Sequence, residues 1–173
     1  ATISGRYFGM DRDENWGRTN KAYEAIVGGR APQTDLHTLF EENYKNGVTD
    51  EFFEPAVVHP GYGGFGIDDA IICFNFRADR MRQITSLFAK QHSDMPLLTM
   101  MSYKDDIPAQ VLFPTEAIAN HLIEVFENNN RVHHHISESE KYAHVTYFFN
   151  GRREKAYPHE KRMHIKSYND IAT

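Results

Sequence analysis

The sequence predicts an α/β fold, on two observations. Residues 70–76 form the most apolar run of the chain, which is typical of a strand buried on both faces of a parallel sheet. Residues 79–90, with apolar side chains at helical spacing, and the extended run 97–103 follow it. Strand, helix and strand in this order indicate a βαβ unit with parallel strands.

The segments on either side of this unit continue the alternation of helices and strands. Before it we expect a strand over residues 1–8, a helix capped within 13–15 and ending at Gly28, a helix over 35–46, and a loop over 48–66. After it we expect a linker over 108–114, a helix over 115–128, a strand over 132–136, a helix over 137–149, and a strand over 164–167. Because the chain starts within a strand, we expect it to be a piece of a longer protein.

Composition narrows the functional classes. The 173 residues are 40% hydrophobic and 25% charged, as in ordinary globular domains, and their net charge of -5 disfavours nucleic-acid binding, including RNA binding on Tyr, Phe and Arg platforms. The sequence has neither the ~20 apolar residues of a membrane span nor a signal peptide. The single cysteine, Cys73, allows no intramolecular disulfide and no four-cysteine zinc site. We expect Cys73 to be an unreactive residue of the core. We also expect the protein to be cytoplasmic.

Arginines follow two of the expected strands. Arg6 and Arg12 come after the first strand, and the segment Arg77-Ala78-Asp79-Arg80 comes after the buried one. Ligands of α/β sheets bind beyond the carboxyl ends of the strands, and guanidinium groups bind phosphate and carboxylate in a bidentate manner. These residues could therefore bind a small, doubly anionic ligand. The alternative, favoured on spacing alone, is that they pair with Asp11, Asp13 and Asp79 and only hold the loops.

Three other features have a structural interpretation. The glycines of residues 61–66 precede a strand and do not open a helix, so we interpret them as a flexible connector. Residues 133–135 are three histidines on one expected strand, where at most two could reach one metal ion, and we expect partly exposed strand residues. Lys141 precedes an apolar stretch and could be a partly desolvated phosphate ligand or an exposed lysine.

Four segments together resemble the cofactor-independent phosphoglycerate mutases. These are Ser4-Gly5-Arg6-Tyr7-Phe8-Gly9-Met10-Asp11-Arg12-Asp13, Asn46-Gly47-Val48-Thr49-Asp50-Glu51-Phe52, Phe74-Asn75-Phe76-Arg77-Ala78-Asp79-Arg80, and residues 138–151, which begin Glu138-Ser139-Glu140-Lys141-Tyr142. They occur in the order and at the separations of the family. With this resemblance, a substrate-binding role of the arginines becomes the favoured interpretation.

The resemblance implies interconversion of 3-phosphoglycerate and 2-phosphoglycerate through a phosphoserine intermediate, in glycolysis and gluconeogenesis. It implies two divalent metal ions, manganese by expectation, and no need for 2,3-bisphosphoglycerate. Residues 1–110 would be the later half of an inserted phosphotransferase domain, and 111–173 a linker and the start of the returning alkaline-phosphatase-like domain. Arg6, Arg12 and residues 77–80 would bind substrate, with Lys141 contributed by the second of these domains.

The sequence lacks some of the motifs that the family carries. It contains neither the motif of the serine nucleophile nor the segments that supply metal ligands, so the resemblance assigns no nucleophile and no metal ligand to this chain. We therefore expect the isolated chain to be inactive and the rest of its parent protein to be its partner. The alternative function is a non-catalytic module that binds a small phosphorylated acid.

Overall fold

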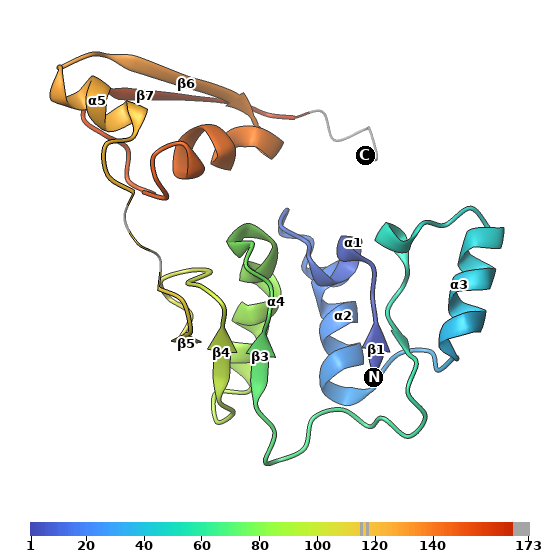
Figure 1. Cartoon of the computed structure of the whole chain (residues 1–173). Helices are drawn as coiled ribbons and strands as arrows, with labels where there is room; N and C mark the ends of the chain where they lie inside the picture. The colour runs from blue at the N-terminus through green and yellow to red at the C-terminus, as the bar shows by residue number, and fades with distance from the viewer. Residues whose placement is uncertain (115, 117, 168–173) are drawn as a thin grey trace. The chain divides into compact units, whose positions relative to one another are not determined.

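A computed structural model describes residues 1–114, 116 and 118–167 of the chain, which forms two compact units, residues 1–115 and 116–173 (Figure 1). The α/β character predicted from the sequence is confirmed, because both units combine helices with parallel strands. Each unit is described by itself.

The strands of the first unit form two small sheets. Strand β1 (Thr2–Ile3) pairs antiparallel with β2 (Ala56–Val57). Strands β3 (Ile71–Cys73), β4 (Leu97–Thr99) and β5 (Gln110–Val111) form a parallel sheet in that order. The βαβ unit predicted from the sequence is confirmed by the parallel pairing of β3 with β4.

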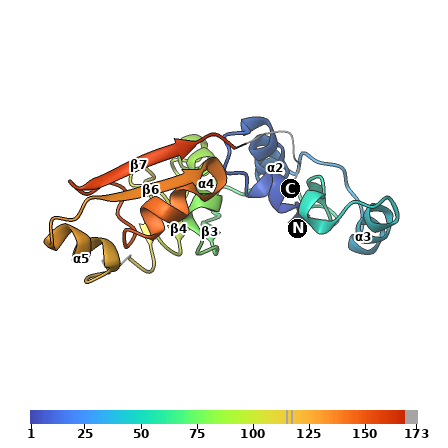
Figure 2. The same cartoon turned by 90° about the horizontal axis from the view of Figure 1, so that it is seen from above.

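Four helices belong to the first unit: α1 (Arg6–Gly9), α2 (Trp16–Gly28), α3 (Leu36–Lys45) and α4 (Ala78–Gln91). The Asp35 side chain caps α3 by accepting a hydrogen bond from the Thr38 backbone N–H, and Gly29 ends α2 in the left-handed conformation (φ +61°) that favours glycine. Helices α2 and α4 lie side by side in both views (Figures 1 and 2). Their inward faces form the main core of the unit with Phe8, Ile71 and Leu97.

The glycine-rich connector has a packing role. The backbone N–H of Phe65 donates to the carbonyl of Val27 at the end of α2, 2.9 Å away. A Cβ atom on Gly64 (φ +102°) would lie 2.1 Å from that same carbonyl oxygen, so only glycine fits there. The loop 61–66 is thus fixed against the end of α2 before the chain enters β3.

The second unit is built on two parallel strands, β6 (His133–Glu138) and β7 (Glu160–Ile165). Helix α5 (Leu122–Asn128) and the irregular helical turns η2 (Ser139–Lys141) and η3 (His144–Phe148) lie on one side of this pair (Figures 1 and 2). His133 and His135 face inward, whereas Ile136, Met163 and Ile165 are exposed.

Several boundaries predicted from the sequence are wrong. The strand expected over residues 1–8 ends at Ile3, and α1 follows because the Gly5 carbonyl accepts the helical bonds of Phe8 and Gly9. The expected loop 48–66 contains β2 and a 3-10 turn, η1 (Asp50–Phe52), and the expected linker 108–114 contains β5. Of the helix expected over 115–128, residues 115 and 117 lie outside the described residues, and the helix begins at Leu122. The last strand begins at Glu160 and not at His164.

The strand expected over 70–76 is shorter and less buried than predicted. It ends at Cys73, and its side chains alternate, with Ile71 and Cys73 buried and Ile72 60% exposed. Phe74 and Phe76 are also exposed, at 78% and 79%. Only one face of this strand is therefore covered, although a purely apolar run predicts burial on both.

Candidate functional site

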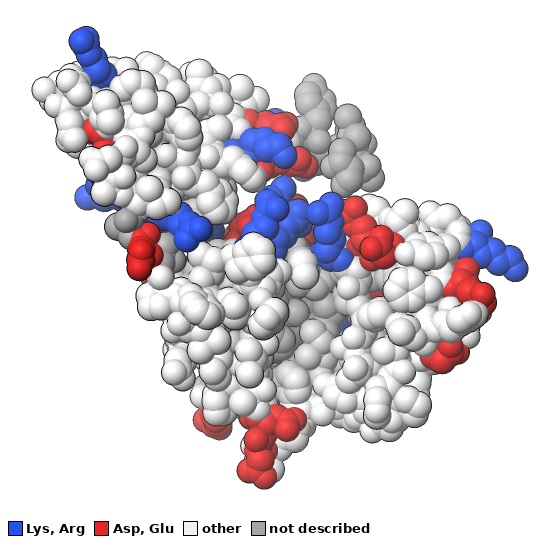
Figure 3. Space-filling view, viewed as in Figure 1, with Lys and Arg blue, Asp and Glu red and all other residues white. Residues whose placement is uncertain are grey.

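Four arginines of the first unit gather at the end of β3 and the start of α4. We call Arg6, Arg12, Arg77 and Arg80 the arginine cluster. Blue side chains in Figure 3 lie together along the edge of the first unit where β1 and β3 end in Figure 1. The strands that precede these arginines, β1 and β3, belong to two separate sheets, so the arginines do not follow paired neighbouring strands.

Asp79 holds two members of the cluster. Its Oδ2 lies 3.2 Å from Nη1 of Arg12, and its Oδ1 accepts a 3.1 Å hydrogen bond from Nε of Arg77. The side chains of Arg12 and Asp79 are only 17% and 13% exposed, so this pair is shielded from water. Burial alone would raise the pKa of Asp79, but the hydrogen bond from Arg12 and the charge of Arg77 outweigh it and hold the pKa below its usual value.

The other two members have partners other than Asp79. Arg80 donates from Nη1 to the carbonyl of Met10, 3.1 Å away, and Arg6 pairs with Glu51 at 2.7 Å. Burial and then the positive charges of Arg12, Arg6 and Arg77 lower the pKa of Arg80. The four guanidinium groups thus repel one another, and two carboxylates, Asp79 and Glu51, leave the cluster with a net charge of plus two.

A buried carboxylate shapes the loop that carries Arg12. Asp11 is 4% exposed and accepts hydrogen bonds from the backbone N–H groups of Asp13 and Asn15, at 3.1 and 2.9 Å. Gln83 of α4 accepts from the backbone N–H of Glu14 at 3.0 Å, which fastens the same loop to the helix. Asp11 and Asp13 were expected as possible partners of the cluster. Asp11 instead organises the loop and pairs with Arg18, and the contact described for Asp13 is the one from its backbone N–H to Asp11.

The first turn of α4 adds backbone donors to the cluster. Arg77 is its N-cap residue, Ala78 is its buried first residue, and no side chain caps its N–H groups. The N-terminus of a 14-residue helix carries a partial positive charge and binds anions. The arginine cluster and this helix end together can bind a small anion with more than one negative charge.

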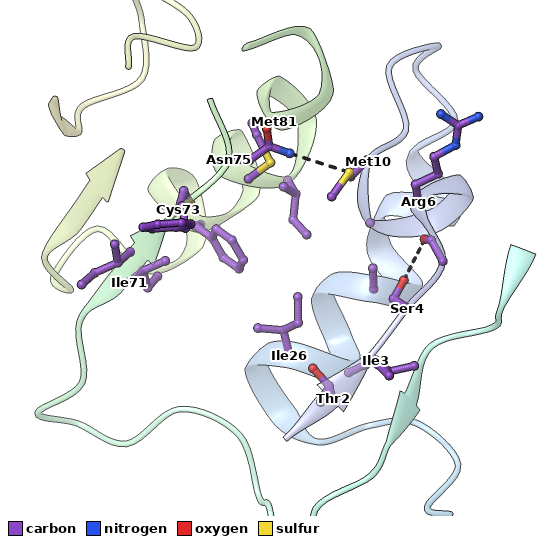
Figure 4. Close-up of a pocket in the computed structure, with 18 of the residues that line it drawn as sticks. Thr2, Ile3, Ser4, Arg6, Met10, Ile26, Ile71, Cys73, Asn75 and Met81 are labelled. Carbon is purple, nitrogen blue, oxygen red and sulfur yellow. Dashed lines mark hydrogen bonds between the residues drawn. The ribbon is translucent and has the colours of Figure 1, made fainter. Parts of the chain in front are cut away.

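A groove of about 480 Å³ lies beside the cluster (Figure 4). Its walls are residues 2–6 on one side and 70–75 on the other, and helices α2 and α4 line it with mostly apolar side chains. Figure 4 places Arg6 and Asn75 at the same end of the groove. The buried Cys73 lines it too, and burial raises the pKa of its thiol to about 11, so the thiol stays protonated at neutral pH.

Lys141 belongs to the second unit, at the end of η2, and is exposed. The partial desolvation considered from the sequence is therefore wrong. The expected contact of Lys141 with the substrate remains a prediction.

A partly buried network of histidines and glutamates was missed from the sequence. His133 hydrogen-bonds to Glu127 at 3.1 Å and to His135 at 3.0 Å, and His159 binds the other oxygen of Glu127 at 3.0 Å. His135 Nδ1 lies 3.4 Å from Glu160. Two of the three consecutive histidines are thus buried, and the expectation of partly exposed residues holds only for His134. The glutamate partners lie 6 and 25 residues away in sequence, too far for a spacing rule to find.

This network predicts that acid destabilises the second unit. Burial lowers the pKa of His135 from 6.5 despite the opposing charge of Glu160, so the folded state binds a proton less readily than the unfolded state. Stability is therefore lost as the pH falls below about 6.5, by at most about 1.4 kcal/mol per pH unit. Glu127 and Glu160, whose pKa values are lowered from 4.5, add a further loss below that value.

The test compares denaturant unfolding of the second unit at pH 7.5 and pH 5.5 in two matched variants. His135→Gln should lose less stability on acidification than the unsubstituted chain. His134→Gln, at the exposed neighbouring position, should lose as much stability as the unsubstituted chain. Equal pH dependence in both variants would contradict the assignment to His135.

Within the described residues, no three His, Cys, Asp or Glu side chains are arranged to hold a metal ion. The part of the chain that the structure describes contains no helix of the length and apolarity that crossing a membrane requires.

Comparisons with known proteins agree on one family. Residues 1–105 match the family described as BPG-independent PGAM N-terminus. Over 96% of its length the chain is similar to curated proteins called 2,3-bisphosphoglycerate-independent phosphoglycerate mutase, with 44% identity to that of Wolbachia pipientis and 41% to one of Methanosarcina barkeri. It spans 34% and 35% of these relatives, about a third of their length.

A solved structure is similar over nearly the whole chain. The phosphoglycerate mutase of Leishmania mexicana, studied at low cobalt concentration, matches 98% of this chain with a TM-score of 0.79 and 29% identity. The match covers 35% of that protein.

Proposed function

Because the chain belongs to the BPG-independent phosphoglycerate mutase family, we propose that it forms part of a mutase that interconverts 3-phosphoglycerate and 2-phosphoglycerate. Its contribution is the binding of the substrate. The observation that carries this proposal is the arginine cluster, with a net charge of plus two beside the uncapped end of α4.

The geometry of the cluster suits a phosphorylated carboxylic acid. Among the described contacts Asp79 engages only Nε of Arg77, so both Nη atoms remain for an anion, and a guanidinium binds phosphate or carboxylate through two parallel bonds. Arg12 is held rigidly by the same carboxylate, so little side-chain entropy is lost when it binds a ligand. Residues 77–80 thus act through Arg77, Arg80 and the backbone of Ala78, while Asp79 positions the arginines.

The remaining parts of the reaction belong, in this proposal, to the rest of the protein. Phosphoryl transfer through a serine requires an activated nucleophile and cations that neutralise the developing charge. The side chains of the described residues do not form a metal site. Two divalent ions, manganese by preference, would be held elsewhere, and Lys141 would contribute from the alkaline-phosphatase-like part that begins after residue 110. The glycolytic reaction and the single free thiol favour the cytoplasm.

Arg77→Lys in the whole mutase tests the proposal. Lysine keeps the charge but replaces a planar bidentate contact by a single point charge. One charged hydrogen bond is worth ~1.5–3 kcal/mol, so kcat/KM should fall roughly tenfold to a hundredfold if the contact acts in the transition state. The matched control is Arg30→Lys, on the same unit but paired with Glu24 outside the cluster, which should leave kcat/KM unchanged. An unchanged kcat/KM in Arg77→Lys would remove Arg77 from the substrate site.

A further inference from the structure

The loop that carries Arg12 contains a residue in an unfavourable backbone conformation. Glu14 has a φ of +61°, in the left-handed region that residues other than glycine rarely adopt. Its side chain is exposed, so the constraint acts through the backbone. Residues in such conformations persist only where the surrounding structure fixes them, and they cluster at functional sites.

A buried glutamine of α4 fixes Glu14 from outside the loop. The backbone N–H of Glu14 donates to Oε1 of Gln83 at 3.0 Å. Gln83 is 6% exposed, and its Nε2 donates at 2.9 Å to the hydroxyl of Thr19, a fully buried residue of α2. The amide of Gln83 thus joins α4, α2 and the loop that precedes α2, and its own position is fixed by the second bond.

Two other contacts between this loop and α4 involve arginines of the cluster. Arg12 pairs with Asp79, and Arg80 donates to the carbonyl of Met10. Both guanidinium groups would gain a further partner when an anion binds, so these contacts can change with the ligand. The bond from Gln83 is made by a neutral, buried amide, and it can hold the loop whether or not an anion is bound.

The bonds of Asp11 do not replace the contact with Gln83. The partners described for Asp11 all lie within residues 13–18, in the loop and the start of α2. These bonds therefore shape the loop. Gln83 instead fixes the loop against α4, one helical turn beyond Asp79 and on the same face of the helix.

We propose that Gln83 is a positioning residue of the substrate site, which holds Glu14 in the left-handed conformation and so fixes the place of Arg12. The bidentate contact of a guanidinium with phosphate or carboxylate depends on orientation, so a displaced loop weakens it. This inference rests on the proposed function, because the place of Arg12 affects turnover only if Arg12 binds the substrate.

Gln83→Met in the whole mutase removes both hydrogen bonds and keeps the length of the side chain. We expect kcat/KM to fall at least about tenfold, and the backbone amide of Glu14 to exchange its hydrogen at least about tenfold faster. Gln83→Glu should recover most of both losses, because its carboxylate can accept from the Glu14 N–H and from the Thr19 hydroxyl. An unchanged kcat/KM in Gln83→Met would overturn the proposal.

The matched control is Gln91→Met. Gln91 lies further along α4 and also links this helix to α2, because it accepts a hydrogen bond from the hydroxyl of Tyr23 at 3.2 Å. The same substitution there, away from the loop, should leave kcat/KM unchanged. An equal loss of kcat/KM in Gln91→Met and Gln83→Met would show that any weakened link between the two helices has this effect, and would overturn the specific role of Gln83.

A double-mutant cycle separates positioning from a general structural defect. Lysine is a point charge on a flexible stem, so it needs less exact placement than a guanidinium. In an Arg12→Lys mutase, Gln83→Met should therefore lower kcat/KM by less than about threefold. Equal losses with arginine and with lysine at position 12 would overturn the proposal, because Gln83 would then act independently of Arg12.

A milder variant keeps the cycle informative if Gln83→Met does not fold. Thr19→Val removes the hydroxyl that holds the amide of Gln83. It should lower kcat/KM at least about threefold when Arg12 is present, and less in the Arg12→Lys mutase. No effect in either background, or the same effect in both, would contradict the proposal.

The role of Gln83 and the proposed function fail in different ways. If Arg12→Lys were as active as the unsubstituted mutase, Arg12 would not bind the substrate, and the proposed function of the cluster would be contradicted together with the role of Gln83. A mutase that is weakened by Arg12→Lys but not by Gln83→Met would contradict the role of Gln83 alone.

Discussion

Asp79→Ala should lower the free energy of unfolding of the first unit by about 3 kcal/mol. The substitution leaves the guanidinium of Arg12, only 17% exposed, without its carboxylate, and removes the partner of Arg77 Nε. Removal of one partner of a shielded ion pair is costly because the other charge stays desolvated. Asp79 also lies in the first turn of α4, where a negative charge stabilises the helix.

The matched control is Asp106→Ala. Asp106 pairs with Lys104, but both side chains are more than half exposed, at 67% and 53%, so this ion pair should contribute less than about 1 kcal/mol. Denaturant unfolding of both variants gives the comparison. If Asp79→Ala were no more destabilising than Asp106→Ala, Asp79 would not be the residue that holds the arginines in place.

The elements that were predicted correctly are those determined by residues close to one another in the sequence. Helices α2, α3 and α4 follow from apolar spacing and from their ends, since Asp35 and Gly29 act through nearby backbone groups. The parallel pairing of β3 with β4 follows from the order of strand, helix and strand.

The elements that were missed depend on distant partners. Strand β2 is two residues long and exists because β1 pairs with it from more than fifty residues away. The exposure of Phe74 and Phe76 contradicts an apolar run that predicts burial, because β3 ends at Cys73 and both side chains lie beyond it. A local apolar pattern reports what a strand can bury and not where the strand ends.

The candidate site, too, could be predicted from the sequence only in part. The arginines that follow two strands were found by position, and their gathering near the end of β3 is what the structure adds. The pairing of Asp79 with both Arg12 and Arg77 spans 67 residues in one case, beyond any spacing rule. In the second unit, Glu127 and Glu160 reach His133 and His135 only through the fold.

The isolated 173-residue chain should bind 3-phosphoglycerate without turning it over. It offers arginines that orient an anion, but its sequence lacks the nucleophile motif of the family, and without a nucleophile most of the barrier to phosphoryl transfer remains. A coupled assay for the enolase product, with and without manganese, should therefore give only background.

Calorimetric titration of the chain with 3-phosphoglycerate measures the binding itself. We expect one saturable site, which Arg77→Lys weakens roughly tenfold or more and Arg30→Lys does not, and no binding of a short oligonucleotide. Absence of 3-phosphoglycerate binding, or equal affinity in the unsubstituted chain and in Arg77→Lys, would contradict the assignment of the arginine cluster as the phosphoglycerate site.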